Sequence, residues 1–247
     1  MAEPSVLGVF AHPDDESLSA GGLLARAAAA GARTAVVTAT WAEESLRAPE
    51  LAEALRILGA GEPRMLGYAD AQVPASAPGR PRFVDASLDE AVGALVAHIR
   101  EVRPDLVVTH DAYGGLTGHV DHRHTYRVAL LATQAAGLEQ LYPEAGEPWQ
   151  PRAMLLATHP QPVVAGLADV VGAQRAVHGV PDEQITDRLD VRPWLEQKVA
   201  AVLAHRSEAE RGAVPGLVAA ASPEAREALL ATEWFIRWSP FPAGAAR

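Results

Sequence analysis

Short apolar runs that alternate with segments of helical periodicity constrain the fold of this chain most strongly. Each run is too short for a buried helix and carries no helical stripe, so it is typical of a strand buried in a parallel sheet. The expected strands are residues 6–11, 34–40, 106–109, 153–158 and 234–238. Helices are expected at 17–30, 50–58, 88–103, 120–136, 194–205 and 223–231. This order predicts βαβ units and an α/β fold with a Rossmann-like, mostly parallel sheet flanked by helices.

Length and composition favour one compact domain over residues 1–247. The chain is 49% hydrophobic and 21% charged, which is an ordinary globular balance. The net charge of −10 and the pI near 5.3 disfavour binding to nucleic acid or to an anionic membrane surface. No secretory signal is visible after Met1, and no apolar stretch approaches the roughly 20 residues that span a bilayer. We therefore expect a cytoplasmic protein; the sequence leaves open whether it forms a homo-oligomer.

Two clusters of imidazoles and carboxylates follow expected strands. The first is Ala11-His12-Pro13-Asp14-Asp15-Glu16, and the second is Gly118-His119-Val120-Asp121-His122 at the start of a helix. Ligands of such sheets bind beyond the carboxyl ends of the strands. The chain has no cysteine, so a metal there would need His, Asp or Glu ligands. Three such ligands and an open position are typical of catalytic zinc.

Each cluster also has an ordinary structural interpretation. Three acids at a helix start often only cap the helix and complement its dipole. A lone pair of histidines three residues apart, such as His119 and His122, is more often solvated or structural. Both clusters at matching strand ends in one chain make the functional interpretation the stronger one.

The two clusters resemble the motifs of the LmbE-like, PIG-L family of zinc-dependent N-acetylglucosaminyl deacetylases. That family includes the mycothiol and bacillithiol pathway deacetylases, the mycothiol S-conjugate amidase and the eukaryotic phosphatidylinositol-glycan deacetylase. The resemblance extends to Leu66–Asp70, to the helix that begins near Arg47 and to Lys198–Glu208. It implies a metal-dependent hydrolase that removes an acetyl or other acyl group from a small amino-sugar substrate of the N-acetylglucosamine type.

The resemblance also implies roles for individual residues. His12, Asp15 and His122 would hold Zn²⁺, and Asp14 would be the general base that takes a proton from the metal-bound water. His119 would stabilise the oxyanion and protonate the leaving amine, and Asp121 would keep His119 protonated. Arg47 would bind the substrate. Sites of this composition also accept Fe²⁺, Co²⁺ and Mn²⁺.

Three positions depart from the family pattern or border the predicted site. Trp41 stands in a loop where the family usually has a Gly-Glu pair, so its indole could stack on a sugar ring or simply pack. Tyr113 belongs to the glycine-rich turn before His119 and could reach the oxyanion. Glu208 replaces a common glutamine. These differences leave the substrate's aglycone and acyl group open.

Alternative functions remain. Within the family, an amidase on mycothiol-type conjugates or a tailoring deacetylase of a glycosylated natural product fits the same residues. A nucleotide-binding Rossmann module is disfavoured because His12-Pro13 occupies the turn where G-x-G-x-x-G would be needed. A non-catalytic sugar-binding protein is disfavoured because both Asp14 and His119 are present.

Overall fold

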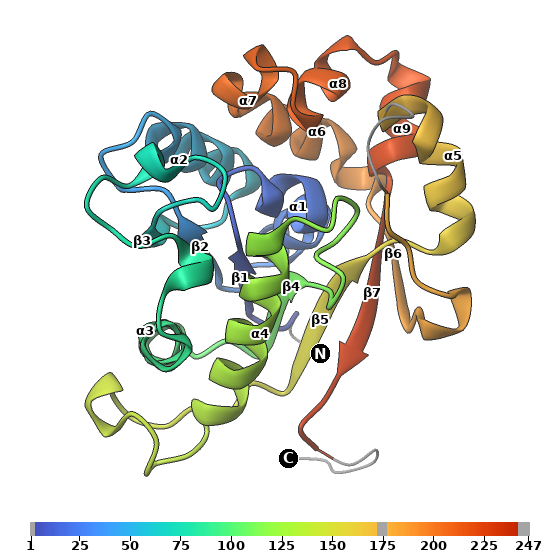
Figure 1. The fold of residues 1–247 in the computed structure, drawn as a ribbon. Helices are drawn as coiled ribbons and strands as arrows, with labels where there is room; N and C mark the ends of the chain where they lie inside the picture. Colours follow the sequence, from blue (N-terminus) through green and yellow to red (C-terminus); the bar gives the residue numbers. More distant parts are fainter. Residues whose placement is uncertain (1–2, 172–176, 242–247) are drawn as a thin grey trace.

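The computed structural model describes residues 3–171 and 177–241, and its seven strands join one mostly parallel sheet (Figure 1). The strands are β1 (Val6–Phe10), β2 (Thr34–Thr40), β3 (Pro63–Tyr68), β4 (Leu106–His110), β5 (Ala153–Thr158), β6 (Asp187–Asp190) and β7 (Thr232–Trp238). Their order in the sheet is β3-β2-β1-β4-β5-β7-β6. The first five are parallel, and β7 is antiparallel to both β5 and β6. The predicted Rossmann-like α/β fold is confirmed.

Helices cover both faces of this sheet. They are α1 (Asp15–Ala29), α2 (Arg47–Leu58), α3 (Leu88–Val102), α4 (Val120–Ala135), α5 (Gln161–Val171), α6 (Leu195–Ala204), α7 (Arg206–Glu210), α8 (Val214–Ala220) and α9 (Pro223–Leu230). Helices α1, α2 and α6 pack together on one face, and α3 and α4 pack on the other. None of the described helices is long and apolar enough to cross a membrane.

Alternation along the strands produces two cores, one on each face. In β1, Leu7 and Val9 face the core under α3 and α4, whereas Val6 and Phe10 face the core under α1 and α2. All five residues of β1 are buried, which explains why the run is apolar throughout. A third, smaller core joins α6, α8 and α9 around Val202, Val218 and Leu230.

The connection order places a crevice between β1 and β4. From β1 the chain builds outward through β2 to β3, and it then returns to the other side of β1 with β4 and β5. Ligands of doubly wound sheets bind at this reversal of strand order, beyond the carboxyl ends of the strands. Both predicted clusters follow these two strands. The expectation of a single domain over residues 1–247 stays a prediction, which the one continuous sheet supports.

Several expected elements differ from the structure. The last strand is β7, and it begins two residues earlier than the expected 234–238. Helices α5, α7 and α8 and the short strand β6 were not predicted. The position of His124 on α4 predicts a surface side chain, but His124 is half-buried, with its ring edge-on to Phe83. The sequence from Ser239 onward predicts a loose end, and residues 242–247 of it lie outside the described residues.

Candidate metal centre and active site

The predicted metal ligands come from the two connections at the crevice. His12 and Asp15 lie where β1 passes into α1, and His122 lies in the first turn of α4. Strands β1 and β4 are parallel neighbours, so their carboxyl ends lie at the same edge of the sheet. The glycine-rich turn before α4 folds back over that edge, because Gly114, Gly115 and Gly118 all adopt positive φ angles that other residues rarely take.

The two predicted imidazoles lie close to each other, and each lies close to a different oxygen of the Asp15 carboxylate. His12 Nδ1 lies 3.1 Å from His122 Nε2 and 3.2 Å from Asp15 Oδ2, and His122 Nε2 lies 3.3 Å from Asp15 Oδ1. Ligand atoms at about 2.0–2.1 Å around a tetrahedral zinc ion lie about 3.3–3.4 Å from one another. The individual contacts are therefore of the length found between neighbouring zinc ligands, with the two Asp15 oxygens divided between the two imidazoles.

The opposite nitrogen of each imidazole is held by an acceptor. His12 Nε2 lies 3.2 Å from Asp70 Oδ2 and 3.3 Å from Asp121 Oδ2, and His122 Nδ1 lies 3.0 Å from the carbonyl oxygen of Gly114. An imidazole that donates its outer N–H in this way presents a lone pair on its inner nitrogen, which is the arrangement common around bound metals. The donor set thus fits a divalent cation.

Overlapping groups of His and Asp include the predicted ligands. Three such groups among the described residues have metal-ligand spacing, and the three predicted ligands are divided among them: Asp15 with His110 and His122, His12 with His119 and His122, and His12 with Asp70, His119 and Asp121. His110 Nε2 accepts the backbone N–H of Ala11 at 3.2 Å, and its ring stacks on His122 at 4.0 Å between centroids. Burial lowers the pKa of His110 to about 4. His110 is therefore a neutral strand-end histidine that supports the ring of His122.

Asp14 is held in a strained conformation beside the predicted ligands. Its φ angle of 131° lies in a region that residues with a side chain rarely adopt. The backbone N–H of Asp14 donates to Glu16 Oε2 at 3.0 Å, and Glu16 in turn is bound by His205 Nε2 at 2.9 Å. Burial is the main cause that raises the pKa of Asp14 to about 6, against the opposing effect of the Arg47 guanidinium. A carboxylate with this pKa suits proton transfer near neutral pH.

Arg47 is directed at Asp14 inside the protein. Its side chain is 2% exposed, and Nη2 lies 3.0 Å from Asp14 Oδ1 and donates to the carbonyl oxygen of Pro13. Nη1 lies 3.2 Å from Glu208 Oε1. Arg47 also lines the cavity described below, so a direct substrate contact stays a prediction. Its contacts in the structure position Asp14.

The surroundings of His119 lower the pKa of its imidazole. Burial, reinforced by the neighbouring His12 and His122, lowers the pKa of His119 to about 4, although Asp121 acts in the opposite direction. Its Nδ1 accepts the backbone N–H of Asp121 at 3.1 Å, while the Asp121 carboxylate lies 3.8 Å away and contacts His12. Asp121 thus acts in the expected direction but is outweighed by burial, and its role in protonating His119 stays a prediction. A neutral His119 keeps its single proton on Nε2.

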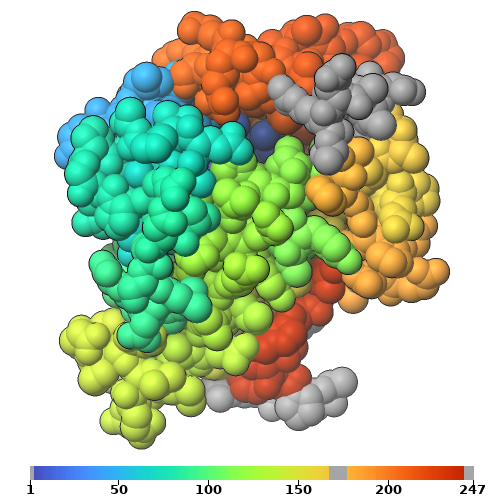
Figure 2. All heavy atoms as spheres, in the orientation of Figure 1, coloured from blue at the N-terminus to red at the C-terminus, as the bar shows by residue number. Residues whose placement is uncertain are grey.

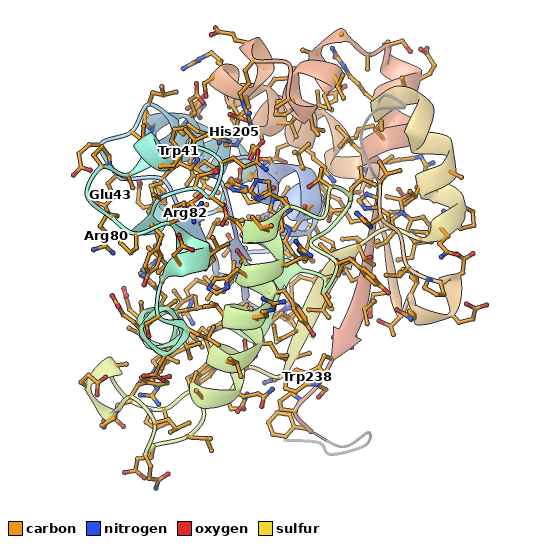
Figure 3. The ribbon with its side chains drawn as sticks, viewed as in Figure 1. Trp41, Glu43, Arg80, Arg82, His205 and Trp238 are labelled. Atoms are coloured by element: carbon orange, nitrogen blue, oxygen red, sulfur yellow. The ribbon has the colours of Figure 1, made fainter. Side chains whose placement is uncertain are left out.

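Two residues with predicted substrate contacts do not line the cavity. Trp41, labelled in Figure 3 near the start of α2, has its ring centroid 4.7 Å from the Arg47 guanidinium carbon. Tyr113 is 51% exposed in the glycine-rich turn. Their substrate contacts stay predictions. Asp70 and Glu208 are site residues that the motifs did not assign, since each reaches the site from an element distant in sequence.

A cavity of about 590 Å³ opens over the cluster. Its lining includes His12, Asp14, Asp15, His119 and His122, together with residues of α1, α8, α9 and β7. Figure 2 shows a hollow bordered by teal, green and orange segments, with the dark blue N-terminal part of the chain visible inside it. The candidate metal site is therefore accessible to a ligand.

Comparison with known protein families agrees with this geometry. Residues 7–133 match the family model PIG-L, described as GlcNAc-PI de-N-acetylase. A 1D-myo-inositol 2-acetamido-2-deoxy-alpha-D-glucopyranoside deacetylase from Rhodococcus jostii is 36% identical over 271 residues, which cover 96% of this chain and 92% of the relative. This chain belongs to the PIG-L family.

Solved structures share the fold of this PIG-L protein. The conserved protein TT1542 from Thermus thermophilus matches with a TM-score of 0.66 and 26% identity, over 100% of this chain and 98% of that one. The N,N'-diacetylchitobiose deacetylase from Pyrococcus horikoshii matches with a TM-score of 0.65 and 21% identity, over 96% of this chain and 84% of that one. The second match supports the fold alone.

Proposed function

We propose that this PIG-L protein is a zinc-dependent N-deacetylase that acts on a small N-acetylglucosamine-type substrate. The observation that carries the proposal is the close approach of His12, Asp15 and His122, whose side-chain atoms lie 3.1–3.3 Å apart in pairs, next to Asp14 and within a ligand-accessible cavity. The family and the deacetylase named among its relatives support the same reaction.

His12, Asp15 and His122 would hold the cation. When bound, the cation would act as a Lewis acid that polarises the amide carbonyl and makes water a stronger nucleophile at neutral pH. Fe²⁺, Co²⁺ and Mn²⁺ remain alternatives to Zn²⁺, because ligands of this type accept all of them.

Asp14 would accept the proton of the attacking water. Its pKa of about 6 leaves it ionised at neutral pH and still basic enough for this transfer. The strained backbone and the Arg47 contact fix the carboxylate in one orientation. The same group can then deliver the proton to the departing amine, which cannot leave as an anion.

His119 would stabilise the oxyanion. Its Nδ1 is occupied by the N–H of Asp121, so its Nε2–H is the proton available for donation. A neutral donor in a buried site provides such stabilisation without a second titrating group. Asp121 would act by orienting both His119 and His12.

The proposal also assigns roles to three residues outside the metal-ligand cluster. Arg47 would act mainly through Asp14, while Trp41 and Tyr113 would contact the substrate at the rim. A cytoplasmic location and a homo-oligomeric state are compatible with the described chain, and neither depends on the chemistry of the site.

Amine release from N-acetylglucosaminides tests the proposal. Protein loaded with one equivalent of Zn²⁺ should release glucosamine-type product and acetate in equal amounts. Asp14→Asn should lose most of this activity while keeping its metal, because the side chain keeps its shape and loses its basicity. Absence of turnover by the metal-loaded wild type on a panel of N-acetylated amino sugars would reject the function.

A further inference from the structure

The cavity has two ends of different chemistry. Asp70 and Gln72, which follow β3, line a polar end beside the metal ligands. The far end is lined by an apolar wing, which we define as Leu18, Val214, Leu217, Val218, Leu229 and Leu230. These residues come from α1, α8 and α9.

The apolar wing is an incompletely covered part of the third core. Val218 and Leu230 are buried there, whereas Leu18, Val214 and Leu229 are only partly buried around them. Partly buried apolar side chains that line a cavity offer favourable contact area to an apolar ligand.

The charged side chains at this end already have partners. Lys198 Nζ lies 2.7 Å from Glu233 Oε1, and Arg211 binds Glu208. The buried Nδ1 of His159 is an exception, because it has no partner among the described residues. A polyhydroxylated group would therefore find few free partners along the apolar wing.

The sheet order places the metal ligands between the two ends. The polar end follows β3 on one side of β1 and β4, and the apolar wing lies on the side of β5 and β7. Helix α9 contacts β7, and α8 contacts α5, which follows β5 (Figure 1). When the carbonyl carbon of an amide lies at the metal site, its acyl chain and its sugar extend from that carbon in different directions. Both oxygens of Asp70 already have partners, so the exposed side chain of Gln72 is the group that can meet sugar hydroxyls at the polar end, and the acyl chain is then directed to the wing.

We propose that the apolar wing binds the alkyl part of an N-acyl group longer than acetyl, so that the favoured substrates are N-acylglucosaminides with medium alkyl chains. This inference rests on the proposed hydrolase function. In the reaction, the oxygen of water bonds to the acyl carbon and the carbon–nitrogen bond breaks. The amine takes up a proton, and the products are a fatty carboxylate and the free amino sugar.

A series of substrates with one fixed aglycone and acyl chains of two to eight carbons provides the first test. Full burial of a methylene contributes about 0.8 kcal/mol, or about a fourfold gain in kcat/KM. We expect kcat/KM to rise at least tenfold between the acetyl and the hexanoyl substrate. A steady decrease of kcat/KM for acyl chains longer than acetyl overturns the inference. If kcat/KM rises instead for an N-acetyl substrate with an octyl aglycone, the assignment of the wing to the acyl side is overturned.

Failure of this inference is distinguishable from failure of the proposed function. If the acetyl substrate is hydrolysed and the longer chains are not, only the acyl-chain assignment is lost. If the metal-loaded protein hydrolyses no member of the series, the hydrolase function itself is rejected.

Variants that fill the apolar wing provide the second test. Leu217→Trp should lower the ratio of octanoyl to acetyl kcat/KM by at least tenfold, and Val214→Phe serves as the second variant if Leu217→Trp does not fold. Leu138→Trp is the matched control, because Leu138 is 50% exposed and is not among the residues that line the cavity. Calorimetric binding of octanoate should weaken in the same two variants and not in the control. An unchanged ratio in a folded wing variant overturns the inference.

Discussion

The buried ion pair between Lys198 and Glu233 allows the loss of folding stability in a variant to be predicted. Lys198, the only lysine of the chain, is 1% exposed, and its Nζ lies 2.7 Å from Glu233 Oε1. Glu233 also accepts the backbone N–H groups of Gly22 at 2.7 Å and Leu23 at 2.9 Å. The pair thus ties α6 and β7 to the middle of α1, under the cavity that holds the candidate site.

Replacing Lys198 by Met keeps the apolar stem and removes the charge. The carboxylate of Glu233 is then buried without a cation, and breaking a buried pair in this way costs about 3–5 kcal/mol. For a chain of this size each kcal/mol lowers Tm by about 2–4 °C, so we expect a decrease of about 6–20 °C. Urea denaturation followed by circular dichroism, together with calorimetry, would measure both quantities.

The double variant Lys198→Met with Glu233→Gln separates the pair from the packing. It removes both charges and keeps one oxygen that can accept one of the two N–H groups of Gly22 and Leu23, so it should recover part of the lost stability. A loss below about 1 kcal/mol for Lys198→Met alone, which is typical of exposed pairs, would refute the reasoning.

Three further predictions concern the site. Gly114→Ala should weaken metal binding by about 10–100-fold, because a Cβ there would lie 3.0 Å from the His119 carbonyl oxygen and 3.2 Å from His122 Cβ. The control is Gly79→Ala, because Gly79 has a similar positive φ and nothing lies within 4 Å of its added Cβ. Equal metal affinities of the two variants, measured by competition with a chelator, would contradict the prediction. Asp14→Asn should lower kcat by about 10²–10⁴-fold with little change in metal content, and a smaller loss would mean that another group takes the proton. Removal of the metal with a chelator should abolish amide hydrolysis and Zn²⁺ or Co²⁺ should restore it, whereas full activity of metal-free protein would exclude the proposed chemistry.

Most of the central sheet could be predicted from the sequence because burial determines it. The run 34–40 is buried at every position in β2 and contains only alanine and β-branched residues, and its limits were predicted correctly. Strand β6 was missed because Asp187–Asp190 is a short edge strand with alternating partial exposure, which allows charged residues. Helix α8 contains Pro215 and Gly216, which disguise its periodicity.

The same distinction applies to the candidate site. The proximity of His12, Asp15 and His122 could be expected because each cluster is contiguous in sequence and follows a recognisable strand. Their assignment as metal ligands came from the family resemblance and stays a prediction. Asp70 and Glu208 reach the site only through tertiary contacts, and a lone carboxylate on a loop or helix gives no signal of its own. The lowered pKa of His119 could not be predicted either, because it depends on burial and on the distances to its charged neighbours.

Anomalous diffraction at the zinc absorption edge, from crystals of the zinc-loaded protein, tests the central claim most directly. We predict one strong peak within bonding distance of His12 Nδ1, His122 Nε2 and the Asp15 carboxylate. A peak bound instead by Asp70, His119 and Asp121, or no ordered peak in the crevice between β1 and β4, would contradict the account.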